Sequence, residues 1–197
     1  RTLAIREATR IITESVTELG EKNPIVVIAG LPAAGKSTLA NSVRDSLAKK
    51  GMLSAVLDKD EVAAPFEGMA MHSLVGDEFV RDGSVYRTMV LPETDAIMTA
   101  LVRMTRDAGL AVLVDRPYIE EANQAVASGD HLSVILSEKF DRPVFMTVWV
   151  DVDATAQYQR MVDRGLIRDQ AKLADFSSYR DDLGAATSFP PDLCDVY

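Results

Sequence analysis

Apolar residues recur along this chain in two patterns, and the alternation between them predicts the fold class. Short continuous apolar runs cover residues 25–29, 54–57, 110–114 and 144–150, which is typical of strands that are buried on both faces. Between these runs, apolar residues recur at three- and four-residue steps, as in amphipathic helices. Strands that alternate with helices predict an α/β fold, a parallel β-sheet with helices on both faces.

The helical pattern begins at the N-terminus, where Ile5, Ala8, Ile12, Val16 and Leu19 share one face and Gly20 ends the segment. Further helices are predicted over residues 39–51, 97–109, 120–141, 154–164 and 168–183. Residues 65–92 mix Gly, Asp and Met without a clean period. We therefore expect short helices and loops in that stretch.

Acidic residues follow three of the predicted strands: Asp58, Asp115 and Asp151. The carboxyl ends of strands are where ligands bind in open α/β sheets. The first predicted strand runs directly into Gly30-Leu31-Pro32-Ala33-Ala34-Gly35-Lys36-Ser37-Thr38. The sequence therefore places its acids beside this loop.

The loop fits the Walker A pattern in a strand-to-helix context, which favours ATP or GTP as ligand. Gly30 and Gly35 allow backbone N–H groups to point at phosphate oxygens, and the following helix adds its positive dipole end. Lys36, expected as a solvated cation, can reach the β- and γ-phosphates, and the Ser37 hydroxyl can bind Mg²⁺. A glycine-rich turn without a ligand is the structural alternative. The predicted nucleotide-binding residues here are Gly30, Ala33, Ala34, Gly35, Lys36, Ser37 and Thr38.

Three acidic residues near the ends of these strands suggest chemistry. Asp58 and Asp60 follow the second strand, where a carboxylate can orient an incoming hydroxyl and accept its proton. A helix N-cap in a solvated turn would explain the same residues. Asp115 ends an apolar run in the Walker B manner, which predicts a carboxylate that holds Mg²⁺ directly or through water.

Arg160, Arg164 and Arg168 lie four residues apart, so they would share one face of a continuous helix. Like charges at that spacing repel unless an anion lies between them. The row predicts a lid over the triphosphate that stabilises charge during transfer. Asp163 and Asp169 could instead neutralise the row on a solvated helix face.

Composition excludes several classes. The 197 residues suit one domain, and the net charge of −9 makes a nucleic-acid partner unlikely without a local basic groove. Cys194 is the only cysteine, which excludes an intrachain disulfide and a metal cluster built on cysteine. The two histidines, His72 and His131, lie far apart and do not suggest a metal pair. The sequence has no apolar run near the ~20 residues that span a bilayer and no signal-peptide core, so a cytoplasmic protein is expected.

The motifs together resemble the small P-loop kinases of the nucleoside-monophosphate-kinase-like group. The segments that carry the resemblance are GLPAAGKST, LDKDEV, LVDRPY and RMVDRGLIRD, within a stretch from about Ile25 to Leu183. Related enzymes include polynucleotide 5′-hydroxyl kinases, adenylylsulfate kinase, gluconate kinase, chloramphenicol phosphotransferase and the zeta toxins. The resemblance implies a P-loop NTPase fold and a helical, arginine-bearing lid over about residues 153–170.

The resemblance also assigns roles to residues. The catalytic base corresponds best to Asp60, with Asp58 beside it, and the lid arginines to Arg160, Arg164 and Arg168. It implies a division into an N-terminal helix (residues 1–22), which departs from the family pattern, and a kinase domain (residues 23–197). Residues 195–197 correspond to the place where the family would begin or continue a last strand and helix.

The acceptor is expected between Asp60 and the segment 65–92, where Arg81, Tyr86 and Arg87 are candidate substrate residues, with Asp77 and Asp82 nearby. Loop salt bridges would explain the same residues. A small polyol, a nucleoside or, by analogy with the chloramphenicol enzyme, an antibiotic fits the acidic composition. The alternatives are a polynucleotide 5′-hydroxyl kinase and a nucleotide-dependent switch or binding protein, although the Asn-Lys-x-Asp motif of GTPases is absent.

Overall fold

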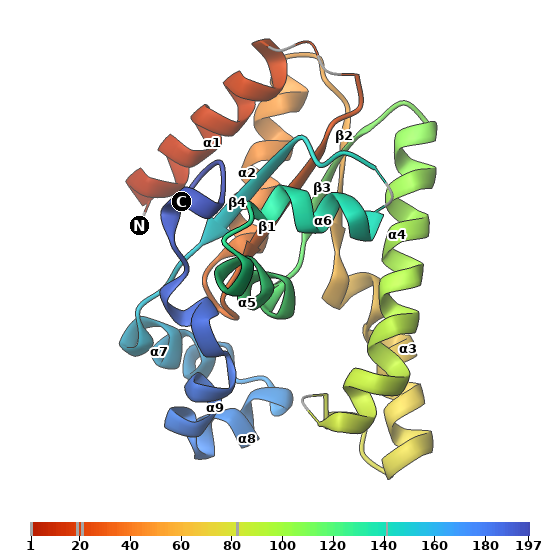
Figure 1. The fold of residues 1–197 in the computed structure, drawn as a ribbon, viewed down its shortest axis with the longest axis vertical. Coiled ribbons are helices and arrows are strands. Elements are labelled where there is room, and N and C mark those ends of the chain that lie inside the picture. Colours follow the sequence, from red (N-terminus) through yellow and green to blue (C-terminus); the bar gives the residue numbers. More distant parts are fainter. Residues whose placement is uncertain (1, 19, 21, 82, 141) are drawn as a thin grey trace.

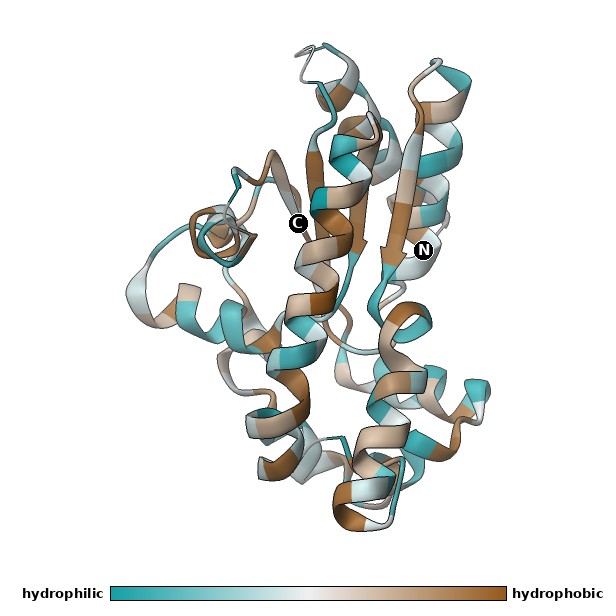
Figure 2. Cartoon of the chain, turned by 90° about the vertical axis from the view of Figure 1, so that its right-hand side faces the viewer, coloured by the Kyte–Doolittle hydropathy of each residue, from teal (hydrophilic) through white to brown (hydrophobic). Residues whose placement is uncertain are grey.

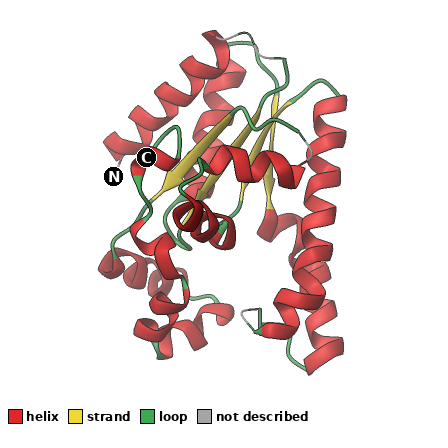
Figure 3. Cartoon of the chain, viewed as in Figure 1, coloured by secondary structure: helices red, strands yellow, loops and turns green. Residues whose placement is uncertain are grey.

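The sheet of the computed structural model is parallel, with the strand order β2-β3-β1-β4 (Figure 3). The structure describes residues 2–18, 20, 22–81, 83–140 and 142–197. Every residue of the two central strands is buried, as the continuous apolar runs predict. The strands are β1 (Ile25–Gly30), β2 (Ser54–Asp58), β3 (Ala111–Asp115) and β4 (Met146–Val150).

Helices cover both faces of the sheet (Figure 1), so the predicted P-loop NTPase architecture is confirmed. One face carries α1 (Thr2–Glu18) and α2 (Lys36–Lys49), which share a core with β1, β3 and β4. The other face carries α4 (Leu91–Asp107), α5 (Ile119–Ser128) and α6 (Leu132–Phe140). In Figure 2 the brown apolar segments concentrate on the strands between these layers.

The N-terminal helix α1 is anchored by Ile12 and Val16, which are fully buried against α2 and the sheet. Leu19, assigned to the same face from the sequence, lies outside the described residues. The division of the chain at residue 22 stays a prediction. None of the helices in the described part of the chain is long and apolar enough to cross a membrane.

The segment that follows β2 differs from the prediction of short helices and loops. Residues Lys59–Val75 form one continuous helix, α3, with Pro65 inside it. A π-helical turn, η1 (Tyr86–Val90), then leads directly into α4, which begins at Leu91 rather than near residue 97. The buried positions Ala63, Glu67 and Met71 of α3 do recur at four-residue steps, but the charged middle member hides the apolar period.

In the C-terminal third, the helix predicted over residues 154–164 is confirmed, but the one predicted over residues 168–183 is divided into shorter segments. Helix α7 (Ala154–Arg164) ends at Gly165, whose left-handed φ of 60° closes it. The chain continues as a series of short helical segments, and Val196 then pairs with Val148 of β4 in an isolated parallel bridge. The segments are η2 (Ile167–Asp169), α8 (Gln170–Ala174), α9 (Phe176–Asp182), η3 (Gly184–Ser188) and η4 (Pro191–Leu193).

Gly30 marks the point where β1 becomes the phosphate-binding loop. Its φ is 137°, and a Cβ built there would lie 2.2 Å from the carbonyl oxygen of Val150 in β4. We expect Gly30→Ala to lower the free energy of unfolding by about 3 kcal/mol or more, because backbone strain adds to a clash with main chain that side-chain rotation does not relieve. Urea unfolding measures the change.

Gly51→Ala is the matched control, since Gly51 also has a positive φ, 78°, but has open space where a Cβ would lie. That variant should lose only about 1 kcal/mol, from backbone strain alone. Equal losses in the two variants would show that the close approach to Val150 does not restrict the loop.

Candidate active site

The loop between β1 and α2 has the backbone of a phosphate cradle. Ala33 has a φ of 60° and Gly35 a φ of 110°, and α2 begins directly afterwards at Lys36. A positive φ at alternate residues turns the N–H groups of this loop toward one concave side, where the positive end of the α2 dipole adds to them. The geometry is suited to a polyphosphate.

Lys36 is buried, with 8% of its surface exposed, rather than solvated as expected from the sequence. Its Nζ donates to the carbonyl oxygen of Leu31 at 3.0 Å, which folds the side chain back over the loop. Burial lowers the pKa of Lys36, against the attraction of Asp115 and Asp60. A desolvated cation held above the cradle is arranged to meet phosphate oxygens.

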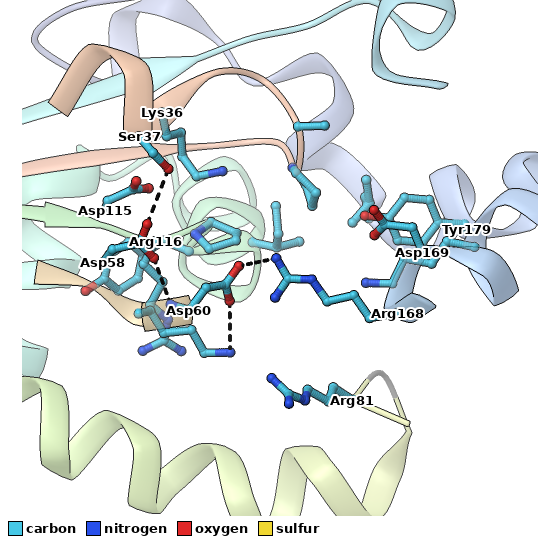
Figure 4. A pocket seen from close by; sticks show the side chains of 18 of the residues that line it. Lys36, Ser37, Asp58, Asp60, Arg81, Asp115, Arg116, Arg168, Asp169 and Tyr179 are labelled. Carbon is cyan, nitrogen blue, oxygen red and sulfur yellow. Dashed lines mark hydrogen bonds and ion pairs between the residues drawn. The ribbon is translucent and has the colours of Figure 1, made fainter. Parts of the chain in front are cut away.

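Asp58 and Asp115 end neighbouring strands and pair directly in the sheet register. Ser37, the second residue of α2, donates its hydroxyl to Asp58 Oδ2 at 3.4 Å (Figure 4). Asp115 is 4% exposed and its Oδ2 has no hydrogen-bond partner among the described residues. Burial raises the pKa of Asp115 to about 6, against the attraction of Lys36.

The oxygens of Ser37 and Asp115 fit Mg²⁺, because a hard cation prefers carboxylate and hydroxyl oxygens. Mg²⁺ would also give the buried Asp115 Oδ2 a partner. No group of three or more His, Cys, Asp or Glu side chains that could hold a metal occurs in the described part of the chain. A cation at Ser37 and Asp115 would therefore complete its shell with water and phosphate oxygens, as Mg²⁺ does in nucleotide sites.

Asp58 and Asp60 have different roles in the local structure. Asp58 is the N-cap of α3, and its Oδ1 accepts a hydrogen bond from the Asp60 backbone N–H at 2.8 Å. The Asp60 side chain is not the cap; it is 46% exposed and accepts from Arg168 Nη2 at 2.7 Å. Burial alone would raise the pKa of Asp60, but attraction to Arg168 and to Lys59 outweighs it, so its pKa is lowered.

The three lid arginines do not form the single row expected from their spacing, because α7 stops at Gly165. Arg160 donates through Nη1 to the carbonyl oxygens of Ala33 and Ala34, at 3.2 and 2.8 Å. Arg164 forms a two-point ion pair with the buried Asp169, at 2.5 and 2.8 Å. The lid thus contacts the phosphate loop through one arginine and Asp60 through another.

Glu67 was missed by the sequence reasoning and is the centre of a hydrogen-bonded cluster beside the pocket wall toward α3. It is fully buried in α3 and accepts from Lys59, Arg81, Tyr86 and the Thr94 hydroxyl. The distances from Tyr86 Oη and Thr94 Oγ1 to Glu67 Oε1 are 2.7 and 3.0 Å. Arg81 and Tyr86, predicted as substrate residues, are therefore held by this carboxylate.

Arg116 and Tyr118 were also missed. Arg116 follows Asp115, is 6% exposed, and forms an ion pair with Asp95 of α4. Its guanidinium carbon lies 4.9 Å from the ring centroid of Tyr118, which adopts a left-handed φ of 52° before α5. The signal available was the DRPY sequence at the end of β3, in which only the aspartate was given a role.

A pocket of about 840 Å³ joins these groups between the strand ends, the α3–α4 arm and the lid segments. Gly30 and Ala34 do not line it, Asp77 is exposed and does not line it either, and Asp82 lies outside the described residues. The other predicted site residues all do: Ala33, Gly35, Lys36, Ser37, Thr38, Asp58, Asp60, Arg81, Tyr86, Arg87, Asp115, Arg160, Arg164 and Arg168.

Comparison with known proteins gives a family model, described as AAA domain, that matches residues 25–184. An adenylyl-sulfate kinase of Prochlorococcus marinus is 30% identical over 129 residues, which cover 63% of this chain and 57% of the relative. The chain therefore spans little more than half of that relative's length.

Among solved structures, a protein from Silicibacter sp. TM1040 that is named as a fructose transport system kinase superposes with a TM-score of 0.56. The identity is 14%, and 96% of each chain is covered. At that identity the likeness concerns the fold.

Proposed function

Since the chain belongs to the AAA-domain family, as a P-loop kinase of the nucleoside-monophosphate-kinase-like group, we propose that it transfers the γ-phosphate of ATP or GTP to a hydroxyl group of a small molecule. The family match and the adenylyl-sulfate kinase relative support a P-loop kinase-like phosphotransferase. The acceptor type and the residues that act on it are the proposal.

The observation that carries this proposal is the position of Asp60 relative to the cradle (Figure 4). Lys36, Ser37 and Asp115 lie on the donor side of the pocket, while Asp60 lies at its wall toward α3 and the lid. A hydroxyl beside Asp60 would therefore face the end of a triphosphate bound to the loop. This is the arrangement that in-line transfer needs.

In the proposed reaction, Lys36 and the loop N–H groups bind the phosphates of the donor. Mg²⁺ held at Ser37 and Asp115 would neutralise charge that develops on the phosphate oxygens. Asp60 accepts the proton of the acceptor hydroxyl, whose oxygen bonds to the γ-phosphorus as the bond from the β–γ bridging oxygen to that phosphorus breaks. The products are a phosphorylated acceptor and ADP or GDP.

The lid arginines would act in this reaction by changing partners. Arg168 donates to Asp60 at 2.7 Å, which makes the carboxylate a weaker base. The γ-phosphate carries more negative charge than a carboxylate, so Arg168 should pair with it when the donor binds. Asp60 is then free to accept a hydrogen bond from the acceptor hydroxyl. Arg164, tied to Asp169, and Arg160, tied to the loop carbonyls, would position the lid against the donor.

The acceptor class is proposed from the pocket and the charge of the chain. A nucleoside, a polyol or a hydroxylated antibiotic would fit a cavity of about 840 Å³. The net charge of −9 disfavours the second candidate, a polynucleotide 5′-hydroxyl kinase. A nucleotide-dependent switch remains the candidate of another class.

Acceptor-dependent release of ADP or GDP separates the kinase from the switch. We expect a pool of nucleosides, polyols and hydroxylated antibiotics to raise the rate about tenfold or more over the rate with water alone, because a positioned hydroxyl replaces a randomly placed one. The same slow release with and without the pool would favour the switch. Strong salt dependence of acceptor binding would point to a polynucleotide instead.

A further inference from the structure

The wall of the pocket toward α3 carries an excess of buried positive charge. Glu67 is fully buried and accepts from Lys59 Nζ at 2.9 Å and from Arg81 Nη1 at 3.1 Å. The two cationic side chains are themselves only 12% and 16% exposed. One buried carboxylate therefore faces two largely buried cations, and an unbalanced charge in such a place is costly unless an anion joins it.

The neighbouring carboxylate does not remove this excess. Asp60 lies 3.9 Å from Lys59, but its closer partner is Arg168 at 2.7 Å. Arg87, an exposed residue at the pocket edge, has no carboxylate within 4 Å in the described part of the chain. The excess therefore lies on the α3 side, where Lys59 and Arg81 share Glu67 and Arg87 adds a third cation. Arg168 is balanced by Asp60 and by the nearby Asp169 and Asp58.

We propose that the acceptor carries an anionic group, a carboxylate, phosphate or sulfate, that binds Arg81 and Arg87 while its hydroxyl lies at Asp60. Figure 4 shows the guanidinium of Arg81 directed into the pocket on the side of Asp60. Arg81 already donates to Glu67 and to the carbonyl oxygens of Ala64 and Glu78, which fixes its guanidinium plane. The remaining N–H of each of its Nη atoms, together with Arg87, can donate to such a group. The excess charge also offsets the repulsion between an anionic acceptor and the triphosphate across the pocket.

Glu67 is a positioning residue in this account. Its carboxylate fixes Lys59 and Arg81, and Tyr86 Oη donates to it at 2.7 Å. Because these contacts leave the excess charge on the side of the pocket where the acceptor is expected, Glu67 orients the cations without touching the acceptor. The inference rests on the proposed function. It narrows the acceptor class from any hydroxylated molecule to one that also carries an anionic group.

The test measures anion binding without any transfer. The protein is saturated with a non-hydrolysable ATP analogue and Mg²⁺, so that the phosphate loop is filled, and its melting temperature is followed against inorganic sulfate. Sulfate stabilises all proteins weakly by exclusion, which gives an unsaturable slope. We expect a saturable rise in addition, from the anion bound at Arg81 and Arg87.

Arg87→Gln and Arg81→Gln should each raise the sulfate concentration at half-saturation by about tenfold, the effect of losing a charge-assisted hydrogen bond. Arg87 is exposed, so its variant is expected to fold even if Arg81→Gln does not. Arg103→Gln is the matched control, because Arg103 is exposed on α4 and does not line this pocket. Its half-saturation should equal that of the unaltered protein.

No saturable rise in the unaltered protein, or equal curves for all four proteins, would overturn the proposal. This result can be told apart from a failure of the proposed function. If sulfate binding needs Arg87 but no hydroxylated acceptor stimulates nucleotide turnover, the anion site stands and the proposed kinase activity is wrong. If phosphate is transferred to ribose in preference to ribose 5-phosphate, kinase activity is supported and the proposal of an anionic acceptor is wrong.

Discussion

Lys36→Met is expected to lower the rate of phosphoryl transfer by about 10³-fold, in the range found when one preorganised electrostatic contact to a transition state is lost. Lys36 is buried and its Nζ donates to the Leu31 carbonyl oxygen. A phosphate that enters the loop meets a cation already stripped of water, so the attraction is strong. Met keeps most of the side-chain volume, which makes the loss electrostatic rather than one of packing.

Stability should respond in the opposite sense to activity. Burial disfavours the charged form of Lys36 and lowers its pKa, so a neutral side chain removes a cost in the ligand-free protein. We expect the melting temperature without nucleotide to be unchanged or higher, and its rise with ATP to be lost. Lys49→Met, in the exposed last turn of the same helix, is the control. Near-normal transfer by folded Lys36→Met protein would remove Lys36 from the mechanism.

Asp60→Asn should lower transfer by roughly 10²–10⁴-fold, the usual cost of losing a general base. The N-cap of α3 is Asp58, whose side chain accepts from the Asp60 backbone N–H, so the substitution leaves the cap intact. Donor affinity should change little, because Asp60 lies on the acceptor side. Transfer rate, donor affinity and melting temperature measured on this variant distinguish a base from a structural residue.

The pH dependence of Asp60 follows from its partners. Its pKa in the folded protein is lowered chiefly by Arg168, against burial. The ion pair therefore contributes stability above the ordinary pKa of aspartate, and this is lost as the pH falls through the lower folded value. The side chain is 46% exposed, so solvent screens the pair and its contribution to stability is small. Unimpaired transfer by Asp60→Asn would move the proposed base to Asp58.

The donor side of the pocket could be predicted from sequence because its signals are local. The glycines and the lysine of the loop follow a buried strand at fixed spacing, and Asp58 and Asp115 directly end the runs that became β2 and β3. Parallel strands bring their carboxyl ends to one edge, so the meeting of Ser37, Asp58 and Asp115 needs no information beyond the strand assignments.

The acceptor side could not be predicted in the same way, because its contacts join residues that are distant along the chain. Glu67 appears as a charge in a helix with no apolar period, and only the tertiary structure shows that it is buried with Lys59 and Arg81. The arginine row failed for a local reason. The helix predicted over residues 154–164 already stops before Gly165, a residue type that ends helices readily. Arg168 therefore lies outside that helix and donates to Asp60.

The most direct test of the central claim follows the γ-phosphoryl group itself. The protein is incubated with Mg²⁺ and with ATP or GTP whose three non-bridging γ-oxygens are ¹⁸O. Nucleosides, polyols, sugar acids and hydroxylated antibiotics are added as a mixture of acceptors, and mass spectrometry locates the label. The account predicts an acceptor that gains a phosphoryl group with all three labelled oxygens, bonded through the acceptor's own unlabelled oxygen. Label that appears only in inorganic phosphate, at one rate with and without acceptors, would contradict it.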